Sequence, residues 1–343
     1  MISVVNRVQS MEKAAFALLF LFLSACSPAP EEIIQFSGKT MGTTYHVTLR
    51  NPGNLESAVL KQQLDYQLAH FNRIASTYID DSELNQLNRA PLAEWQQLSE
   101  PLYNILSLAM EVSWLTAGAF DITVAPLVDI WGFGPLQREG RPSEDEIDAA
   151  LANVGFAQLQ LDMLAPRVMK AAALKIDLSA IAKGYGVDAA AVWLHSLGVQ
   201  DYLVEIGGEM RVAGKSPRGD AWRIGVESPN GGEPQLAIAL EDIAVATSGD
   251  YRNYFEEDGV RYSHTLDPRT GRPIRHSLAS VTVLDASCAF ADAMATAFSV
   301  MGVERTLALA ESQGLAVYLI EKTDEGFVSR YSSAFAPYIH PQE

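Results

Sequence analysis

The sequence is poor in cysteine, in basic residues and in long apolar runs. Only two of its 343 residues are cysteine, Cys26 and Cys288, which excludes a fold held by a network of disulfides. There are 25 Lys and Arg against 42 Asp and Glu, and a net charge of -17 argues against nucleic acid or an anionic membrane surface as the main partner. With 48% hydrophobic and 20% charged residues, the composition is that of a globular protein with a large core.

The longest apolar run near the start covers residues 14–23 and is too short to span a bilayer comfortably. Arg7 and Lys13 precede it, and "LSAC" (23–26) follows it, which resembles a bacterial lipobox. We therefore expect residues 1–25 to be a lipoprotein signal peptide, Cys26 to be lipidated, 26–35 to be a tether and 36–343 to form the folded domain. An uncleaved anchor is the alternative. Cleavage would remove Arg7, Lys13 and Glu12, a net charge of +1, and change the total from -17 to -18.

Apolar periodicity predicts a mixture of helices and strands. Residues 43–49 alternate as a strand does, and Leu60, Leu64, Leu68 and Phe71 then mark one face of a helix. Further helices are predicted at 98–116, from a capping box of Ser143 and Glu146 to Gly155, and at 180–197. Further strands are predicted at 158–161, 167–176, 280–285, 315–322 and 327–333. Residues 202–214 are expected to pair with 222–228, and 251–267 to form a hairpin that turns at Asp258-Gly259. Because hairpins and helices do not alternate strictly, the class is α+β with largely antiparallel sheets and packed helices.

An acid and a hydroxyl lie one turn apart in the apolar stretch "FADAMATAF" (290–298). Asp292 and Thr296 would share one helix face, and no Lys or Arg occurs between Ser287 and Gly302. A buried carboxylate needs a counter-ion, so the pair is either a hard-cation site or part of a half-exposed helix end, with Thr296 bonded back to a carbonyl one turn earlier.

Two other stretches combine chemistry with unusual local sequence. In "DLSAIAKGYGVD" (177–188), Gly184 and Gly186 weaken a helix, which suggests that something approaches its backbone closely. Lys183 beside them suits a phosphate, although a lysine extending to solvent fits equally well. His264 ends a predicted strand just before the Pro and Gly loop of "SHTLDPRTGRPI" (263–274). It is either a residue that transfers protons or an ordinary surface histidine. Asp267 is expected to form the turn.

Taken in order, these segments resemble the ApbE family, the FAD:protein FMN transferases of bacterial envelopes. The resemblance is carried by "MGTTYHVTL", "STYIDDSELNQLN", "GAFDITVAPLV", "DLSAIAKGYGVD", "IGGEMRVAG", "ATSGDYRNYF", "SHTLDPRTGRP" and "ADAMATAFSVMG", within residues 41–302. It implies a T-fold-like ApbE architecture.

The resemblance also implies an activity and a set of site residues. An enzyme of this family binds FAD and Mg²⁺, transfers FMN to a threonine of an acceptor protein, typically a subunit of ion-pumping NADH:quinone reductases (Nqr) or Rnf-type complexes, and releases AMP. His264 would be the catalytic base. By motif match, the FAD site would be lined by Met41, Tyr78, Ala119, Phe120, Asp121, Asp177, Lys183 and Leu266, and the metal site by Ala180, Asp292, Ala295 and Thr296.

Some positions depart from the family pattern. Ala180 replaces a Gly or Ser, so any metal contact there would use its carbonyl oxygen, and Glu205 and Glu209 replace an Asn and an Asp. Ser27 follows Cys26 where an Asp would indicate inner-membrane retention, so an outer-membrane location stays open beside the inner membrane that the family favours. Two other functions are open at this point: an FAD pyrophosphatase that yields free FMN and AMP, and a non-catalytic flavin-binding lipoprotein.

Overall fold

The computed structural model describes residues 32–53, 55–134, 138, 140–229, 231, 234–249, 254–257 and 260–339. The predicted signal peptide, the lipidation site Cys26 and Ser27 lie outside the described residues, as do Asp258 and Gly259 of the predicted hairpin turn. Within the described part of the chain, no helix has the length and apolar character needed to cross a membrane.

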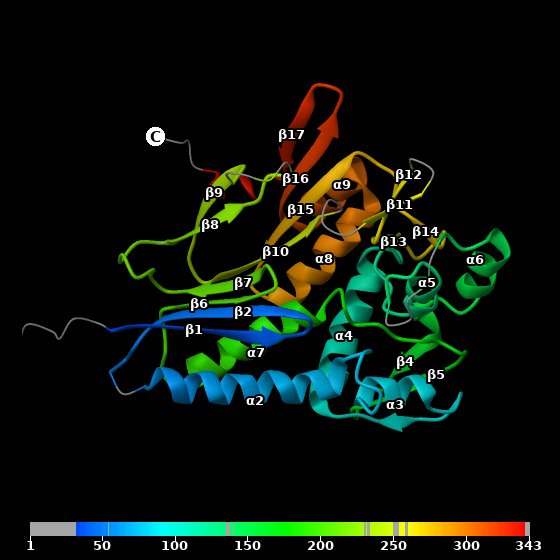
Figure 1. Cartoon of the computed structure of the whole chain (residues 1–343), viewed down its shortest axis with the longest axis horizontal. Helices are drawn as coiled ribbons and strands as arrows, with labels where there is room; N and C mark the ends of the chain where they lie inside the picture. The colour runs from blue at the N-terminus through cyan, green and yellow to red at the C-terminus, as the bar shows by residue number, and fades with distance from the viewer. Residues whose placement is uncertain are drawn as a thin grey trace, which may run out of the picture.

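A single antiparallel sheet of eight strands runs through the molecule in the order β1-β2-β6-β7-β10-β15-β16-β17 (Figure 1). Its strands are β1 (Ile33–Thr40), β2 (Thr43–Arg50), β6 (Tyr202–Ile206), β7 (Glu209–Ala213), β10 (Ile243–Gly249), β15 (Leu278–Asp285), β16 (Ala316–Thr323) and β17 (Gly326–Tyr331). The α+β class and the strands expected at 43–49, 280–285, 315–322 and 327–333 are confirmed. The sheet begins at Ile33, inside the segment predicted as tether, because residues 33–35 pair with 48–50 of β2.

The two faces of the sheet are both covered. Along β10 and β15, Ala246 and Val283 face the helical side, whereas Val245 and Leu284 pack on the opposite side, as the period of two requires. The helical side carries α2 (Ser57–Ala75), α4 (Glu100–Leu115), α7 (Ala182–Ser196) and α8 (Cys288–Met301) (Figure 1). The hairpin of β8 (Trp222–Val226) and β9 (Leu236–Leu240) covers the other side. The prediction that 222–228 pairs with 202–214 is therefore wrong: β6 pairs with β7, and β8 with β9.

The remaining elements are short. The capping box of Ser143 and Glu146 is confirmed at the start of α6, which ends at Leu151 rather than continuing to Gly155. The strand predicted at 167–176 ends at Lys170. These elements are α3 (Glu83–Arg89), α5 (Ala125–Ile130), α6 (Glu144–Leu151), α9 (Val303–Gln313), β3 (Gln96–Gln97), β4 (Leu159–Leu161), β5 (Arg167–Lys170), β11 (Tyr254–Glu257), β12 (Val260–Ser263), β13 (Leu266–Asp267), β14 (Arg272–Pro273) and the 3-10 turns Phe156–Gln158 and Ala336–Tyr338.

Helices α7 and α8 touch backbone to backbone at Gly184. A Cβ atom on Gly184 would lie 2.4 Å from the carbonyl oxygen of Cys288 and 2.8 Å from the Cα of Ala289. The close approach expected at this glycine is therefore made by α8 rather than by a phosphate. It brings the start of α7 against the residues of α8 that carry the site.

Candidate active site

A cavity of about 380 Å³ opens where the starts of α7 and α8 meet the loop between β12 and β13. Its volume falls in the range of small-molecule and cofactor sites, about 300–1,000 Å³. It is lined by eleven of the residues that the motifs predicted: Tyr78, Ala119, Phe120, Asp121, Asp177, Ala180, Lys183, His264, Leu266, Asp292 and Thr296. Two predicted residues are not in its wall: Met41 lies in the β1–β2 turn and is close to Gly186, and Ala295 is fully buried in α8.

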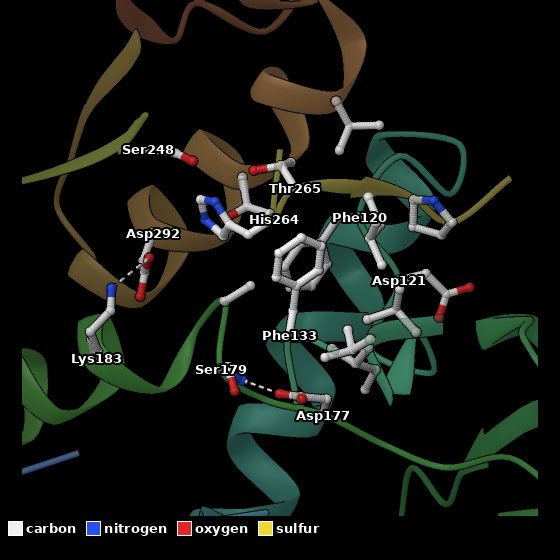
Figure 2. Close-up of a pocket in the computed structure, with 18 of the residues that line it drawn as sticks. Phe120, Asp121, Phe133, Asp177, Ser179, Lys183, Ser248, His264, Thr265 and Asp292 are labelled. Atoms are coloured by element: carbon white, nitrogen blue, oxygen red, sulfur yellow. Dashed lines mark hydrogen bonds and ion pairs between the residues drawn. The ribbon is translucent and has the colours of Figure 1, made fainter. Parts of the chain in front are cut away.

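One end of the cavity is polar, and Lys183 and Asp292 lie there side by side (Figure 2), with Glu209 beside them. Lys183 of α7 places its Nζ 2.7 Å from Oε2 of Glu209, on β7, and 3.7 Å from Oδ1 of Asp292, on α8. Asp292 Oδ2 accepts a hydrogen bond of 3.0 Å from the backbone amide of Gly184, in the first turn of α7. The carboxylate thus faces the positive end of a helix, which stabilises its charge.

Burial and charge act against each other on the pKa values of this cluster. Burial raises the pKa of Glu209 to about 8, and the neighbouring charge of Asp292 adds to the rise, while Lys183 opposes it. Burial alone would lower the pKa of Lys183, but the charges of Asp292 and Glu209 outweigh it and leave that pKa raised. We conclude that Lys183 is protonated, since the two acidic groups beside it favour its charged form.

The donor set near Asp292 fits a small hard cation. The hydroxyl of Thr296 lines the cavity and has no hydrogen-bond partner in the described part of the chain, so the alternative in which it bonds back to its own helix is not observed. The carbonyl oxygen of Ala180 likewise accepts no hydrogen bond from any described residue. No group of three or more His, Cys, Asp or Glu side chains within the described ranges could hold a metal alone. One carboxylate with neutral oxygens suits Mg²⁺, which takes its remaining ligands from water and substrate phosphates.

The middle of the cavity is apolar. Phe120 and Phe133 project into it (Figure 2), and Leu266 is a further apolar residue of its wall. The carboxylate of Asp121 does not serve this space, because Oδ1 accepts hydrogen bonds from the amide and hydroxyl of Thr123 and Oδ2 accepts one from the amide of Phe156. Burial raises the pKa of Asp121, although these bonds oppose the rise. Its side chain therefore ties together two segments of the wall, those of Thr123 and Phe156.

His264 lies between the polar end and the aromatic residues, as Figure 2 shows. It is placed by the chain between β12 and β13, and the ring of Phe133 packs against it edge-on, with centroids 6.4 Å apart. Asp267 forms the following turn as predicted, since its carbonyl accepts from the amides of Thr270 and Gly271. A half-buried imidazole at the end of a strand, open to a ligand cavity, is suited to proton transfer.

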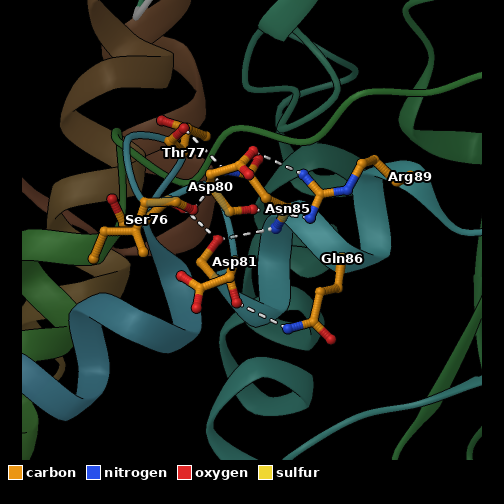
Figure 3. A network of polar contacts seen from close by, with 9 residues as sticks. Ser76, Thr77, Asp80, Asp81, Asn85, Gln86 and Arg89 are labelled. Atoms are coloured by element: carbon orange, nitrogen blue, oxygen red, sulfur yellow. Dashed lines mark hydrogen bonds and ion pairs between the residues drawn. The ribbon is translucent and has the colours of Figure 1, made fainter.

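Tyr78 lines the cavity. The loop around it, from Ser76 to Asp81, is held by a network of polar contacts with α3 (Figure 3). Tyr78 is 69% exposed. The Asn85 amide of α3 donates to the carbonyls of Thr77 and Ile79, at 3.0 and 2.9 Å, and Arg89 donates to the carbonyl of Asp80 at 2.9 Å. The loop backbone is thereby satisfied without regular structure, and an exposed aromatic ring is held beside the site.

Among the lining residues, Glu209 and Phe133 were given no role in the site by the sequence. Glu209 is 3% exposed, and an acid at a buried strand position after two glycines was the available signal. Nothing in the local pattern marks Phe133, which follows α5 in a loop. Thr247 and Ser248, at the end of β10, also line the cavity.

The architecture and this site can be compared with known proteins. The model of the ApbE family matches residues 41–319, which is most of the chain. The chain belongs to the ApbE family. The predicted resemblance is thus confirmed, and the site just described is that of an ApbE protein.

Relatives and solved structures agree with this assignment. The FAD:protein FMN transferase of Vibrio cholerae is 44% identical over 94% of this chain and 98% of the relative, and that of Escherichia coli K12 is 35% identical over 96% and 98%. The structure of the flavin transferase ApbE from Vibrio cholerae superposes with a TM-score of 0.85 at 43% identity, covering 90% of this chain and 100% of that one. The apo flavinyl transferase ApbE of Pseudomonas stutzeri has a TM-score of 0.85 at 40% identity, over 92% and 100%.

Proposed function

We propose that this protein is an FAD:protein FMN transferase, which moves FMN from FAD to a threonine hydroxyl of an acceptor protein and releases AMP. The observation that carries the proposal is the division of one cavity into an apolar part and a polar end. The aromatic residues Phe120 and Phe133 suit a flat ring, and Lys183 and Asp292 suit a diphosphate with its cation. Relatives of nearly full length bear the name of this activity.

Asp292 and Thr296 would hold Mg²⁺ with the carbonyl of Ala180. Ala295, the fourth position given by the motif match, is buried in α8 and does not line the cavity. When bound, the ion neutralises charge on the diphosphate and stabilises the charge that develops as the bridging bond breaks. The residues of the chain supply the rest of the electrostatics. The Gly184 amide orients the carboxylate of Asp292, and the protonated Lys183 lies on the same side of the cavity.

His264 acts as the general base in this proposal. The threonine oxygen attacks the phosphorus of the FMN half, the bond from that phosphorus to the bridging oxygen breaks, and AMP leaves with that oxygen. The proton of the threonine hydroxyl passes to His264. The position of the imidazole between the charged cluster and the aromatic residues supports this role (Figure 2).

The acceptor and the location are part of the same proposal. The signal-like segment 1–25 and Cys26 support export and lipid anchoring, with the domain facing the periplasm. The inner membrane is favoured by the family, and Ser27 leaves the outer membrane possible in principle. Redox subunits of the Nqr or Rnf type, with a Ser/Thr motif, are the acceptors we propose.

An in-gel assay tests the function directly. The mature protein is incubated with FAD, Mg²⁺ and a candidate acceptor, and flavin fluorescence is sought on the denatured acceptor. The matched control is the acceptor with its target threonine replaced by valine. Labelling that requires both FAD and the threonine supports the proposal. Free FMN and AMP without labelling would instead identify an FAD pyrophosphatase, and unchanged FAD would identify a flavin-binding protein.

A further inference from the structure

A partly buried lysine lies between two buried carboxylates that belong to different elements. Lys183, Glu209 and Asp292 have side chains 29%, 4% and 7% exposed, so the three charges interact largely out of water. Charge pairs in such surroundings are much stronger than pairs at the surface. The single ammonium must therefore be shared between the two acids, and the geometry decides how.

The ammonium belongs mainly to Glu209. Its distance to Glu209 is 2.7 Å, that of a close ion pair, whereas its distance to Asp292 is 3.7 Å. Apart from Lys183, no described residue is a partner of Oε2 of Glu209. The proposed reaction assigns Glu209 no contact with FAD, yet the chain places a buried acid against the lysine at the polar end of the cavity.

The division of the ammonium between the two acids matters for Asp292, because its carboxylate has only two oxygens. Oδ2 is engaged by the Gly184 amide, which leaves Oδ1 for a metal ion. A lysine ammonium bonded at about 2.8 Å to Oδ1 would occupy the place of an ion that needs the same oxygen at about 2.0–2.1 Å. Lys183 is thus positioned to compete with a divalent cation for this carboxylate.

We propose that Glu209 is a positioning residue that draws Lys183 away from Asp292 and so keeps Oδ1 of Asp292 open to Mg²⁺. This inference rests on the proposed function, since it assumes that Asp292 is a metal ligand. Without the charge of Glu209, Lys183 closes on Asp292 and acts as an internal competitor of the metal. The effect of Glu209 on metal binding therefore requires Lys183.

The test measures the dissociation constant of Mn²⁺, which serves as a probe of the Mg²⁺ site. The EPR signal of the free ion is followed on the mature protein, with and without saturating FAD. It is carried out on the alkaline side of the Glu209 pKa, where the carboxylate is ionised. Because residues of one charge network are coupled, we expect Glu209→Gln to raise the dissociation constant about tenfold. Glu209→Asp, which keeps the charge, should retain most of the affinity.

The double variant Lys183→Met with Glu209→Gln decides the mechanism. We expect its affinity to return to that of Lys183→Met alone, because the competitor is gone. An unchanged dissociation constant in Glu209→Gln would overturn the proposal. The proposal would also be overturned if the double variant bound Mn²⁺ as weakly as Glu209→Gln, since Glu209 would then be a ligand itself. If Glu209→Gln does not fold, Lys183→Met alone decides: in protein without FAD it must bind Mn²⁺ at least as tightly as the wild type, and weaker binding overturns the proposal.

The failure of the proposed function is read from a different measurement. If the wild-type protein binds Mn²⁺ but never labels an acceptor, the proposed transferase activity is refuted. The role of Glu209 is then still tested by the dissociation constants of its variants. A wild-type protein that binds no Mn²⁺ overturns both.

Discussion

Gly184→Ala tests whether the contact between α7 and α8 holds the site together. The new Cβ would lie 2.4 Å from the Cys288 carbonyl oxygen, so the two backbones would have to separate by about 1 Å to reach an ordinary contact of 3.4 Å. Alanine gains about 1 kcal/mol of helix propensity over glycine. Overpacking against backbone costs about 1–3 kcal/mol, and weakening the Gly184 hydrogen bond to the Asp292 carboxylate costs about 1.5–3 kcal/mol. We expect a net loss of roughly 1.5–5 kcal/mol in the free energy of unfolding.

Gly186→Ala is the matched control in the same helix. Its Cβ would meet the terminal methyl of Met41 at 2.8 Å and that of Ile206 at 3.2 Å, both at the ends of flexible side chains. The same gain in propensity should leave this variant within about 1 kcal/mol of the wild type. Urea unfolding measures both variants, with the slope m expected to stay constant. If Gly184→Ala proves as stable as Gly186→Ala, the close packing of the two helices does not control this site.

Three further predictions concern the reaction. Asp292→Ala should abolish Mg²⁺-dependent flavin transfer, because it removes the one carboxylate of the proposed metal site, and near-normal rates would refute the metal assignment. His264→Ala should keep FAD binding, followed by flavin fluorescence, and lower transfer by about 10²–10⁴-fold; equal loss of binding would make His264 structural. Asn85→Ala removes the side-chain amide that bonds the carbonyls of Thr77 and Ile79 and should raise the dissociation constant of FAD by loosening the Tyr78 loop, with turnover at saturating FAD unchanged. An unaltered FAD affinity would show that this bracing does not serve the ligand.

The fold could be read from the sequence to the extent that local patterns decide it. The periodicity of Leu60, Leu64 and Leu68 located α2, and Ser143 with Glu146 located the start of α6, because burial period and capping are properties of neighbouring residues. The sequence predicted the partners of the strands less well. The strand at 222–226 was matched to the wrong neighbour, since an alternating strand shows which face is buried and not which strand lies beside it.

The same division holds for the site. By itself, the sequence determined the family, the elements that carry the functional residues, and the need of Asp292 for a counter-ion. Only the tertiary structure decided that Lys183 is near enough to serve that acid, that Glu209 holds the lysine more closely, and that the Gly184 amide turns the carboxylate. Gly184 and Asp292 are 108 positions apart, and such a pairing depends on how α7 packs on α8. A local pattern records whether a residue is buried, whereas the partner of a buried charge is chosen by the packing of distant elements.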